Sequence, residues 1–132
     1  MVRSGATTMW ERWDSYTKEH GFGTGGMNSF NHYAYGAVGE WIYGVIGGIR
    51  LLAPGYKNIL FAPEPGGALT HAGAALLTPQ GRAECRWRRC AGKLEVEALV
   101  PPGARGVLRL PGCGVRKLAE GRHRVSAPWR GV

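Results

Sequence analysis

A short segment near the N-terminus, WERWD, gathers side chains that could bind and react with a polar ligand. Trp10 and Trp13 flank Glu11 and Arg12, and Asp14 follows directly. Indole rings can cover the apolar faces of a sugar, whereas carboxylates and a guanidinium group can hydrogen-bond to its hydroxyl groups. The segment therefore favours a carbohydrate site. A simpler alternative is a buried pair of tryptophans three positions apart, with the charged residues on the surface.

His32 is a second candidate binding residue. It falls on the first turn of a predicted helix and off the apolar stripe of that helix. A helix N-terminus carries partial positive charge and free N–H groups, which favour a polar ligand; the alternative is a histidine that faces solvent. The glycine-rich segment GFGTGG, residues 21–26, lacks the strand and βαβ unit of a dinucleotide-binding fingerprint. We interpret it as a flexible approach to the helix.

The spacing of apolar residues predicts one long amphipathic helix over residues 28–50. They recur three and four positions apart, at 30, 34, 37, 38, 41, 42, 45, 46 and 49. Asn28 or Ser29 is predicted to cap the helix, and Pro54 prevents its continuation. A lone helix cannot bury such a stripe. We therefore expect the rest of the chain, another chain or further helices to cover it.

From residue 55 onward the pattern changes to short segments of alternating character separated by turns. The predicted strands lie in YKNILFAP, ALTHAGAALLTP, RAECRWRRC, KLEVEALVPP, RGVLRLP and RHRVSAPW. In KLEVEALV, the apolar residues alternate with Glu95 and Glu97, as expected for a strand with one buried face. About six such strands at regular spacing predict an antiparallel β-sandwich. The fold class is thus α+β, with a helical part over residues 1–54 and a sandwich over residues 55–132.

Charge and cysteine content narrow the classes of function. The chain has a formal net charge of +8, and the basic excess lies in residues 82–132, where twelve Lys and Arg accompany four Glu. These basic residues are dispersed and have no stacking aromatics between them, so we expect no nucleic-acid partner. No segment has the roughly 20 apolar residues of a membrane span, and MVRSGATTMW lacks the apolar core of a signal peptide. Cys85, Cys90 and Cys113 are interpreted as reduced structural thiols, with Cys85 and Cys90 on opposite strand faces, which favours a cytoplasmic location.

Two long motifs resemble the end of the catalytic domain of bacterial α-L-rhamnosidases. They are GATTMWERWDSY and, after a glycine-rich link, GMNSFNHYAYGAVGEWIYGVIGGI. The following PGYKNILFAPEPGGALTHAGAALLTPQGRAECRWRR and VPPGARGVLRLPG resemble the C-terminal β-sandwich of the same family. The resemblance extends over about residues 5–127. It implies that residues 1–54 are the last part of an (α/α)6 six-hairpin barrel, which would account for the unpartnered helix.

The resemblance also implies a reaction and roles for individual residues. Such enzymes remove terminal α-L-rhamnose from rhamnosides with inversion, using a general acid and a general base about 6.5–9.5 Å apart. Glu11 would be the general base, His32 would contact the rhamnose, and Trp10 and Trp13 would shape the pocket. No cofactor or metal is implied. The general acid lies upstream in the family, so we expect the 132-residue chain to be inactive alone.

Two kinds of partner follow from these expectations. One is a rhamnoside substrate. The other is the missing part of the barrel, or a second copy of the chain, covering the apolar face of helix 28–50. A function of a different class is a stand-alone, non-catalytic module that binds carbohydrate or docks onto an enzyme.

Overall fold

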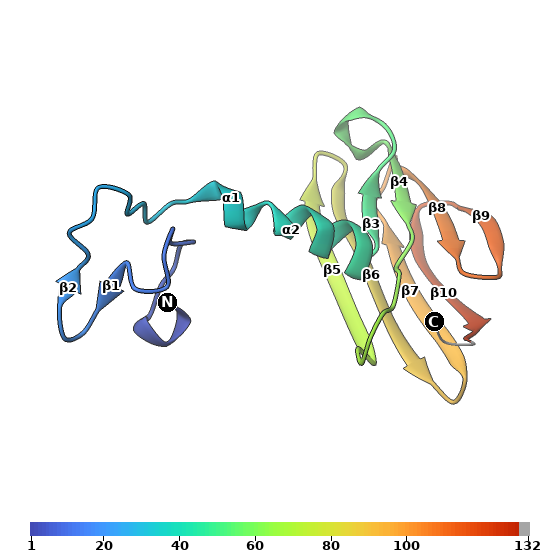
Figure 1. The fold of residues 1–132 in the computed structure, drawn as a ribbon. Coiled ribbons are helices and arrows are strands. Elements are labelled where there is room, and N and C mark those ends of the chain that lie inside the picture. The colour runs from blue at the N-terminus through green and yellow to red at the C-terminus, as the bar shows by residue number, and fades with distance from the viewer. Residues whose placement is uncertain (130–132) are drawn as a thin grey trace. The chain divides into compact units, whose positions relative to one another are not determined.

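The computed structural model describes residues 1–129, which form two compact units (Figure 1). The first unit is Met1–Gly39, and the second begins at Glu40. The second unit contains both large β-sheets and nearly all of the buried apolar residues.

The first unit is built around aromatic side chains and two very short strands, β1 (Tyr16–Thr17) and β2 (Gly21–Phe22), which pair antiparallel. The rings of Trp10, Tyr16, Phe22 and Phe30 pack edge to face, with centroid separations of 5.1–6.4 Å. Asn28 then ties two loops together, because its side-chain amide donates to the carbonyls of Ser15 and Gly23. A 3₁₀ turn at Val2–Ser4 precedes this cluster. Aromatic packing therefore holds a segment that is otherwise mostly loop.

The prediction of one helix over residues 28–50 is wrong in its length and at both ends. The helical residues form α1 (Tyr33–Gly36), α2 (Val38–Trp41) and a π-helical turn, Ile42–Ile46. Asn28 and Ser29 do not cap the helix, because residues 29–32 bond instead to residues 9–11, through Glu11 N–H to Ser29 O and His32 N–H to Met9 O. Residues 49 and 50, predicted as the end of the helix, lie instead in strand β3 (Ile49–Leu51).

Two adjacent glycines explain why the helical segment stops at Ile46. A Cβ on Gly47 would lie 2.5 Å from the Cβ of Ala74, and Gly48 has a φ of +76° and lies against the backbone of Pro63. No other residue fits both a left-handed conformation and such close approach. The chain can therefore turn out of the helix and enter β3 without a break in the packing.

The second unit is the β-sandwich predicted from the sequence, with two four-stranded sheets (Figure 1). One sheet has the order β3-β4-β8-β9 and the other the order β10-β7-β6-β5. Beyond β3, the strands are β4 (Asn58–Phe61), β5 (His71–Thr78), β6 (Gly81–Cys90), β7 (Lys93–Val100), β8 (Arg105–Leu110), β9 (Gly114–Leu118) and β10 (Gly121–Pro128). All pairings are antiparallel except β4 with β8, which is parallel. Strands β3 and β9 were not predicted.

The core lies between the two sheets and follows the alternation of the strands. In β7, every second residue from Leu94 to Val100 is buried, and in β6 Ala83, Cys85 and Trp87 point inward. Ile59 and Phe61 of β4 are fully buried from the opposite sheet. Burial raises the pKa of the Cys85 thiol to about 12, because the thiolate would lose its hydration there. Cys90, by contrast, is exposed, so the two cysteines lie on opposite faces as predicted.

The sandwich also binds the C-terminal end of the helical segment. The last carbonyl groups of a helix have no partner within it. Here Arg50 Nε donates to Gly44 O at 2.9 Å, the backbone N–H of Glu64 donates to Val45 O at 3.0 Å, and Trp87 Nε1 donates to Ile46 O at 2.6 Å. Three consecutive carbonyls thus receive donors from β3, from the loop after β4 and from β6. This contact makes the turn at residues 42–46 part of the sandwich unit.

Candidate active site

Glu11 lies at a bend in a loop whose backbone is fixed by the segment just before α1. Its N–H donates to Ser29 O at 2.8 Å, and the N–H of His32 donates to Met9 O at 2.8 Å. Between these two bonds, the backbone N–H of Ser29 donates to Glu11 Oε2 at 2.7 Å. The Glu11 side chain is only 15% exposed. A charge-assisted bond of this length holds the carboxylate in one orientation.

His32 faces the other oxygen of the same carboxylate. Its Nε2 is 3.9 Å from Glu11 Oε1, which is too long for a direct hydrogen bond. The ring lies beside Tyr35, with 5.2 Å between centroids, and its Nδ1 is buried without a hydrogen-bond partner among the described residues. A carboxylate and an imidazole separated in this way can share a hydroxyl group or a water molecule between them.

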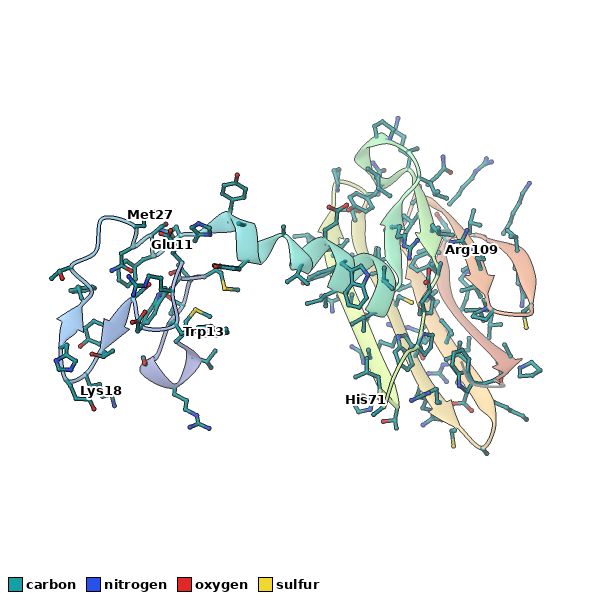
Figure 2. All side chains as sticks on the ribbon, in the orientation of Figure 1. Glu11, Trp13, Lys18, Met27, His71 and Arg109 are labelled. Atoms are coloured by element: carbon teal, nitrogen blue, oxygen red, sulfur yellow. The ribbon has the colours of Figure 1, made fainter. Side chains whose placement is uncertain are left out.

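The two tryptophans of the WERWD segment have different environments. Trp10 is buried, with its ring edge to face against Phe30 and Tyr16. Trp13 is 83% exposed, and Figure 2 labels its side chain together with Glu11. The alternative of a buried tryptophan pair is therefore wrong. Trp10 supports the loop that carries Glu11, and Trp13 presents a free indole ring.

The remaining charged residues of this segment do not join Glu11. Arg12 forms an exposed ion pair with Asp14 at 3.2 Å. Within residues 1–129, no group of three or more His, Cys, Asp and Glu side chains could hold a metal ion. In the same range, no helix is long and apolar enough to cross a membrane. The ionisable groups at the candidate site are thus the carboxylate of Glu11 and the imidazole of His32.

Two contributors to the site were missed at the sequence level. Ser29 acts through its backbone N–H, which no side-chain motif reveals, and it was instead expected to cap the helix. Tyr35 packs against His32, three positions away, and nothing in the sequence distinguishes it from the other tyrosines of the segment. Only the pairing of residues 9–11 with residues 29–32 brings these groups together.

Comparison with known proteins gives matches along nearly the whole chain. Residues 1–46 match the family described as the bacterial alpha-L-rhamnosidase 6 hairpin glycosidase domain, and residues 48–125 match the bacterial alpha-L-rhamnosidase C-terminal domain. An alpha-L-rhamnosidase of Formosa agariphila is 48% identical over 110 residues, which is 83% of this chain and 12% of that protein.

Solved structures give the same result. The crystal structure of Streptomyces avermitilis alpha-L-rhamnosidase complexed with L-rhamnose has a TM-score of 0.78 and 36% identity, covering 96% of this chain and 14% of that one. The Aspergillus terreus enzyme has a TM-score of 0.77 and 40% identity, covering 96% of this chain and 15% of that one. The chain thus spans about one seventh of the length of these relatives.

Proposed function

The chain belongs to the bacterial α-L-rhamnosidase family, and on that premise we propose that it is the C-terminal portion of an enzyme that removes terminal non-reducing α-L-rhamnose from rhamnosides. We propose further that the reaction proceeds with inversion and that Glu11 is its general base.

The geometry of the Glu11 carboxylate is the observation that carries this proposal. A general base needs a fixed carboxylate with one oxygen available to take a proton from water. Glu11 Oε2 is occupied by the Ser29 N–H, whereas Oε1 makes no hydrogen bond among residues 1–129 and is directed toward His32. An attacking water could therefore bind to Oε1. The inverting mechanism places the acid across the sugar, about 6.5–9.5 Å from the base.

His32, Trp10 and Trp13 are assigned to substrate binding. The Nε2 of His32 makes no hydrogen bond to residues 1–129 and lies next to Glu11, so a rhamnose hydroxyl can accept a hydrogen bond from it or donate one to it. Trp13 offers an exposed ring to the apolar face of a sugar, and buried Trp10 keeps the loop in shape. We assign the general acid to a part of the barrel outside this chain, so the 132 residues alone should not hydrolyse rhamnosides.

Exposed apolar side chains on the helical segment support the idea that further barrel helices cover it. Val38, Trp41, Ile42 and Tyr43 are each 44–54% exposed. Four large apolar residues so close in sequence form a surface that a soluble protein normally buries. The missing part of the barrel, or a second copy of the chain, is the proposed cover.

The test of the base is Glu11→Gln in a polypeptide that joins these residues to the upstream barrel. The amide keeps the shape of the side chain and can still accept the Ser29 N–H bond, but it cannot take a proton from water. We expect turnover to fall by about 10²–10⁴-fold. Binding of rhamnose, measured calorimetrically, should stay nearly unchanged. Glu19→Gln is the matched control, since Glu19 is exposed and lies outside the site; equal activity of the two variants would remove Glu11 from the mechanism.

A stand-alone binding module is the competing function, and the mass of the native polypeptide distinguishes the two. A blot with an antibody against the sandwich, on an extract of the native host, measures that mass. A product several times heavier than 14.3 kDa supports the enzyme. A product near 14.3 kDa would contradict it and favour the module. The same extract, fractionated, tests the cytoplasmic location expected from the sequence.

A further inference from the structure

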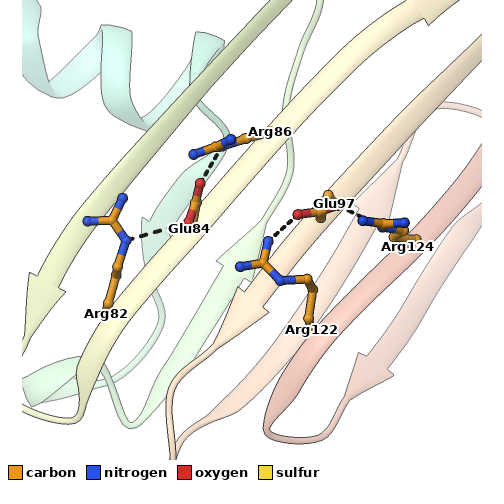
Figure 3. A network of polar contacts seen from close by, with 6 residues as sticks. All are labelled: Arg82, Glu84, Arg86, Glu97, Arg122 and Arg124. Carbon is orange, nitrogen blue, oxygen red and sulfur yellow. Dashed lines mark hydrogen bonds and ion pairs between the residues drawn. The ribbon is translucent and has the colours of Figure 1, made fainter.

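The outer face of the sheet β10-β7-β6-β5 carries a dense network of opposite charges. Its arginines outnumber its glutamates by five to three, and a groove of about 1040 Å³ runs along this face, lined by residues of all four strands. The charged residues are Arg82, Glu84, Arg86, Arg88, Glu95, Glu97, Arg122 and Arg124. Figure 3 shows six of them in two Arg–Glu–Arg groups. Each such group has a net charge of +1.

In both groups, the carboxylate lies beneath its two arginines. The Glu84 side chain is 7% exposed, whereas those of Arg82 and Arg86 are 59% and 66% exposed. Glu97 is 25% exposed, between Arg122 at 46% and Arg124 at 81%. A ligand that enters the groove therefore meets guanidinium groups first. The carboxylates act as a floor that fixes the arginines in place.

The atoms used in these ion pairs leave the outer ends of the arginines available. Arg82, Arg86, Arg88 and Arg124 all bind their carboxylate through Nε. Among the described residues, their terminal nitrogens make no hydrogen bond. Those nitrogens form the planar fork that binds carboxylate and sulfate groups with two parallel bonds. Because each side chain is already held at Nε, less rotamer entropy is lost when a ligand binds.

The strand next to this network leaves room for a ligand. On β5, Gly73 is the register partner of Arg86 and Ala75 is the register partner of Glu84. A Cβ on Gly73 would lie 3.0 Å from Cγ of Arg86, so the absence of a side chain lets the arginine stem lie across β5. Small residues thus form one side of the groove. Arg86 and Arg124, both in register with Glu97, are separated by two strand spacings, about 10 Å.

The side chains of this face select among possible ligands. The centre of a protein interface is poor in charged residues and rich in aromatic ones. This face is instead rich in charged residues and has no outward aromatic ring, which argues against a protein partner. Single-stranded nucleic acid needs aromatic rings for stacking, but the outward positions of β5, β6, β7 and β10 carry no Phe, Tyr or Trp. Glu95, whose side chain is 41% exposed, can instead accept hydrogen bonds from hydroxyl groups.

We propose that this groove binds an acidic saccharide, whose carboxylate or sulfate groups are held by the arginine forks and whose hydroxyl groups bond to the glutamates. The site is separate from Glu11 and does not depend on its role. It gives the sandwich a binding function of its own, directed to glycans that carry negative charge.

The test is calorimetric titration of the whole 132-residue chain at about 0.15 M salt. The probes are a galacturonate oligosaccharide, a neutral maltooligosaccharide of the same length and a single-stranded DNA oligonucleotide. We expect saturable binding of the galacturonate and none of the neutral sugar. The double variant Arg86→Gln/Arg124→Gln should bind at least about tenfold more weakly, because hydrogen bonds between charged groups are lost.

The matched control removes the same charge from the opposite sheet. Arg109 and Arg116, on β8 and β9, are both exposed, and Arg109→Gln/Arg116→Gln should bind like the unchanged chain. If both double variants lost the same affinity for the galacturonate, the binding would arise from general charge attraction, and the proposal would be overturned. Failure of the galacturonate to bind, or tighter binding of the DNA, would also overturn it. None of these results bears on Glu11.

A second measurement avoids any effect of the substitutions on folding. Backbone amide NMR shifts of the unchanged chain, followed during titration with the galacturonate, report where it binds. The shifts should be confined to the strands that line the groove, at residues 71–75, 82–88, 95–97 and 124–126. Shifts centred on β8 and β9 would contradict the proposal.

Discussion

The fold changes the ionisation of Glu97 through its contacts with the neighbouring strand β10. Hydrogen bonds from Arg124 Nε, at 2.7 Å, and from Arg122 lower the pKa of its carboxyl below the ordinary value of 4.5. A carboxyl with a lowered pKa stabilises the folded state fully above its unfolded pKa. This contribution is lost as the pH falls through the folded pKa. The sandwich should therefore lose stability below about pH 4.5 in part through this residue.

The corresponding prediction is that Glu97→Gln flattens the acid branch of the stability curve. The variant should be less stable than the unchanged chain at pH 6, and the difference should shrink toward pH 2 because both side chains are then neutral. Thermal unfolding followed by circular dichroism over pH 2–6 measures it. Glu40→Gln is the control, since Glu40 is exposed and makes no ion pair among residues 1–129. A constant difference between Glu97→Gln and the unchanged chain at all pH values would contradict the prediction.

The candidate site shows what single residues can and cannot reveal. Residue types alone left simpler alternatives open for Glu11 and His32, and the motif resemblance singled them out; the structure places them 3.9 Å apart although 21 positions separate them. The contact from the Ser29 N–H could not be predicted, because it depends on a backbone pairing rather than on a side chain. The different environments of Trp10 and Trp13 also arise from tertiary packing, since the two lie only three positions apart in one short segment.

At the scale of elements, the sequence was enough to predict strands with one buried face, but not the residues at which the helical segment begins and ends. Strand β7 alternates between buried and partly exposed residues along its length, which is the pattern seen in the sequence. The apolar spacing of residues 28–50 predicts a helix only if no other segment offers its backbone competing hydrogen-bond partners. His32 N–H bonds to Met9, and Ile49 pairs with Phe61 in a sheet, so both ends of the apparent helix have other partners. Strand β9, with four exposed residues out of five, has no apolar alternation to detect.

The hydrogen bond from Trp87 of β6 to the end of the helical segment leads to a prediction about stability. Trp87→Phe removes the indole N–H that bonds to Ile46 O and leaves that carbonyl without its donor. Loss of one partner of this part-buried hydrogen bond costs about 1–3 kcal/mol, and the smaller ring also leaves space in the core, so we expect the free energy of unfolding to fall by at least that amount. Urea unfolding followed by circular dichroism is the measurement.

Trp41→Phe serves as the matched control for the Trp87 variant. Trp41 is 54% exposed, so its change should stay within about 0.5 kcal/mol. If the two variants were destabilised equally, the bond from Trp87 to the helical turn would have no special role.

At the scale of the whole molecule, stability is distributed very unevenly between the two units. The core of buried apolar residues lies entirely between Ile49 and Ala127, whereas Trp10 and Ser15 are the buried residues noted in Met1–Gly39. Regions with few buried contacts open at low free-energy cost, and proteases cleave them first. Brief trypsin digestion should therefore cut after Arg12 and Lys18 while the strands remain intact. The surviving product should begin near Glu19 and include all eight strands of the two large sheets.

Mass spectrometry over the course of the digestion checks this order of cleavage. Arg89, Lys93 and Lys117 lie in strands or at their ends, so their peptide bonds become accessible only when the sandwich opens. A sample digested in urea is the control, because there all sites should be cut at similar rates. Cleavage at the strand sites before Arg12 in the folded chain would contradict the division of stability. If residues 1–39 are completed by further barrel helices, as proposed, Arg12 and Lys18 should become resistant in the longer polypeptide while the strand sites do not change.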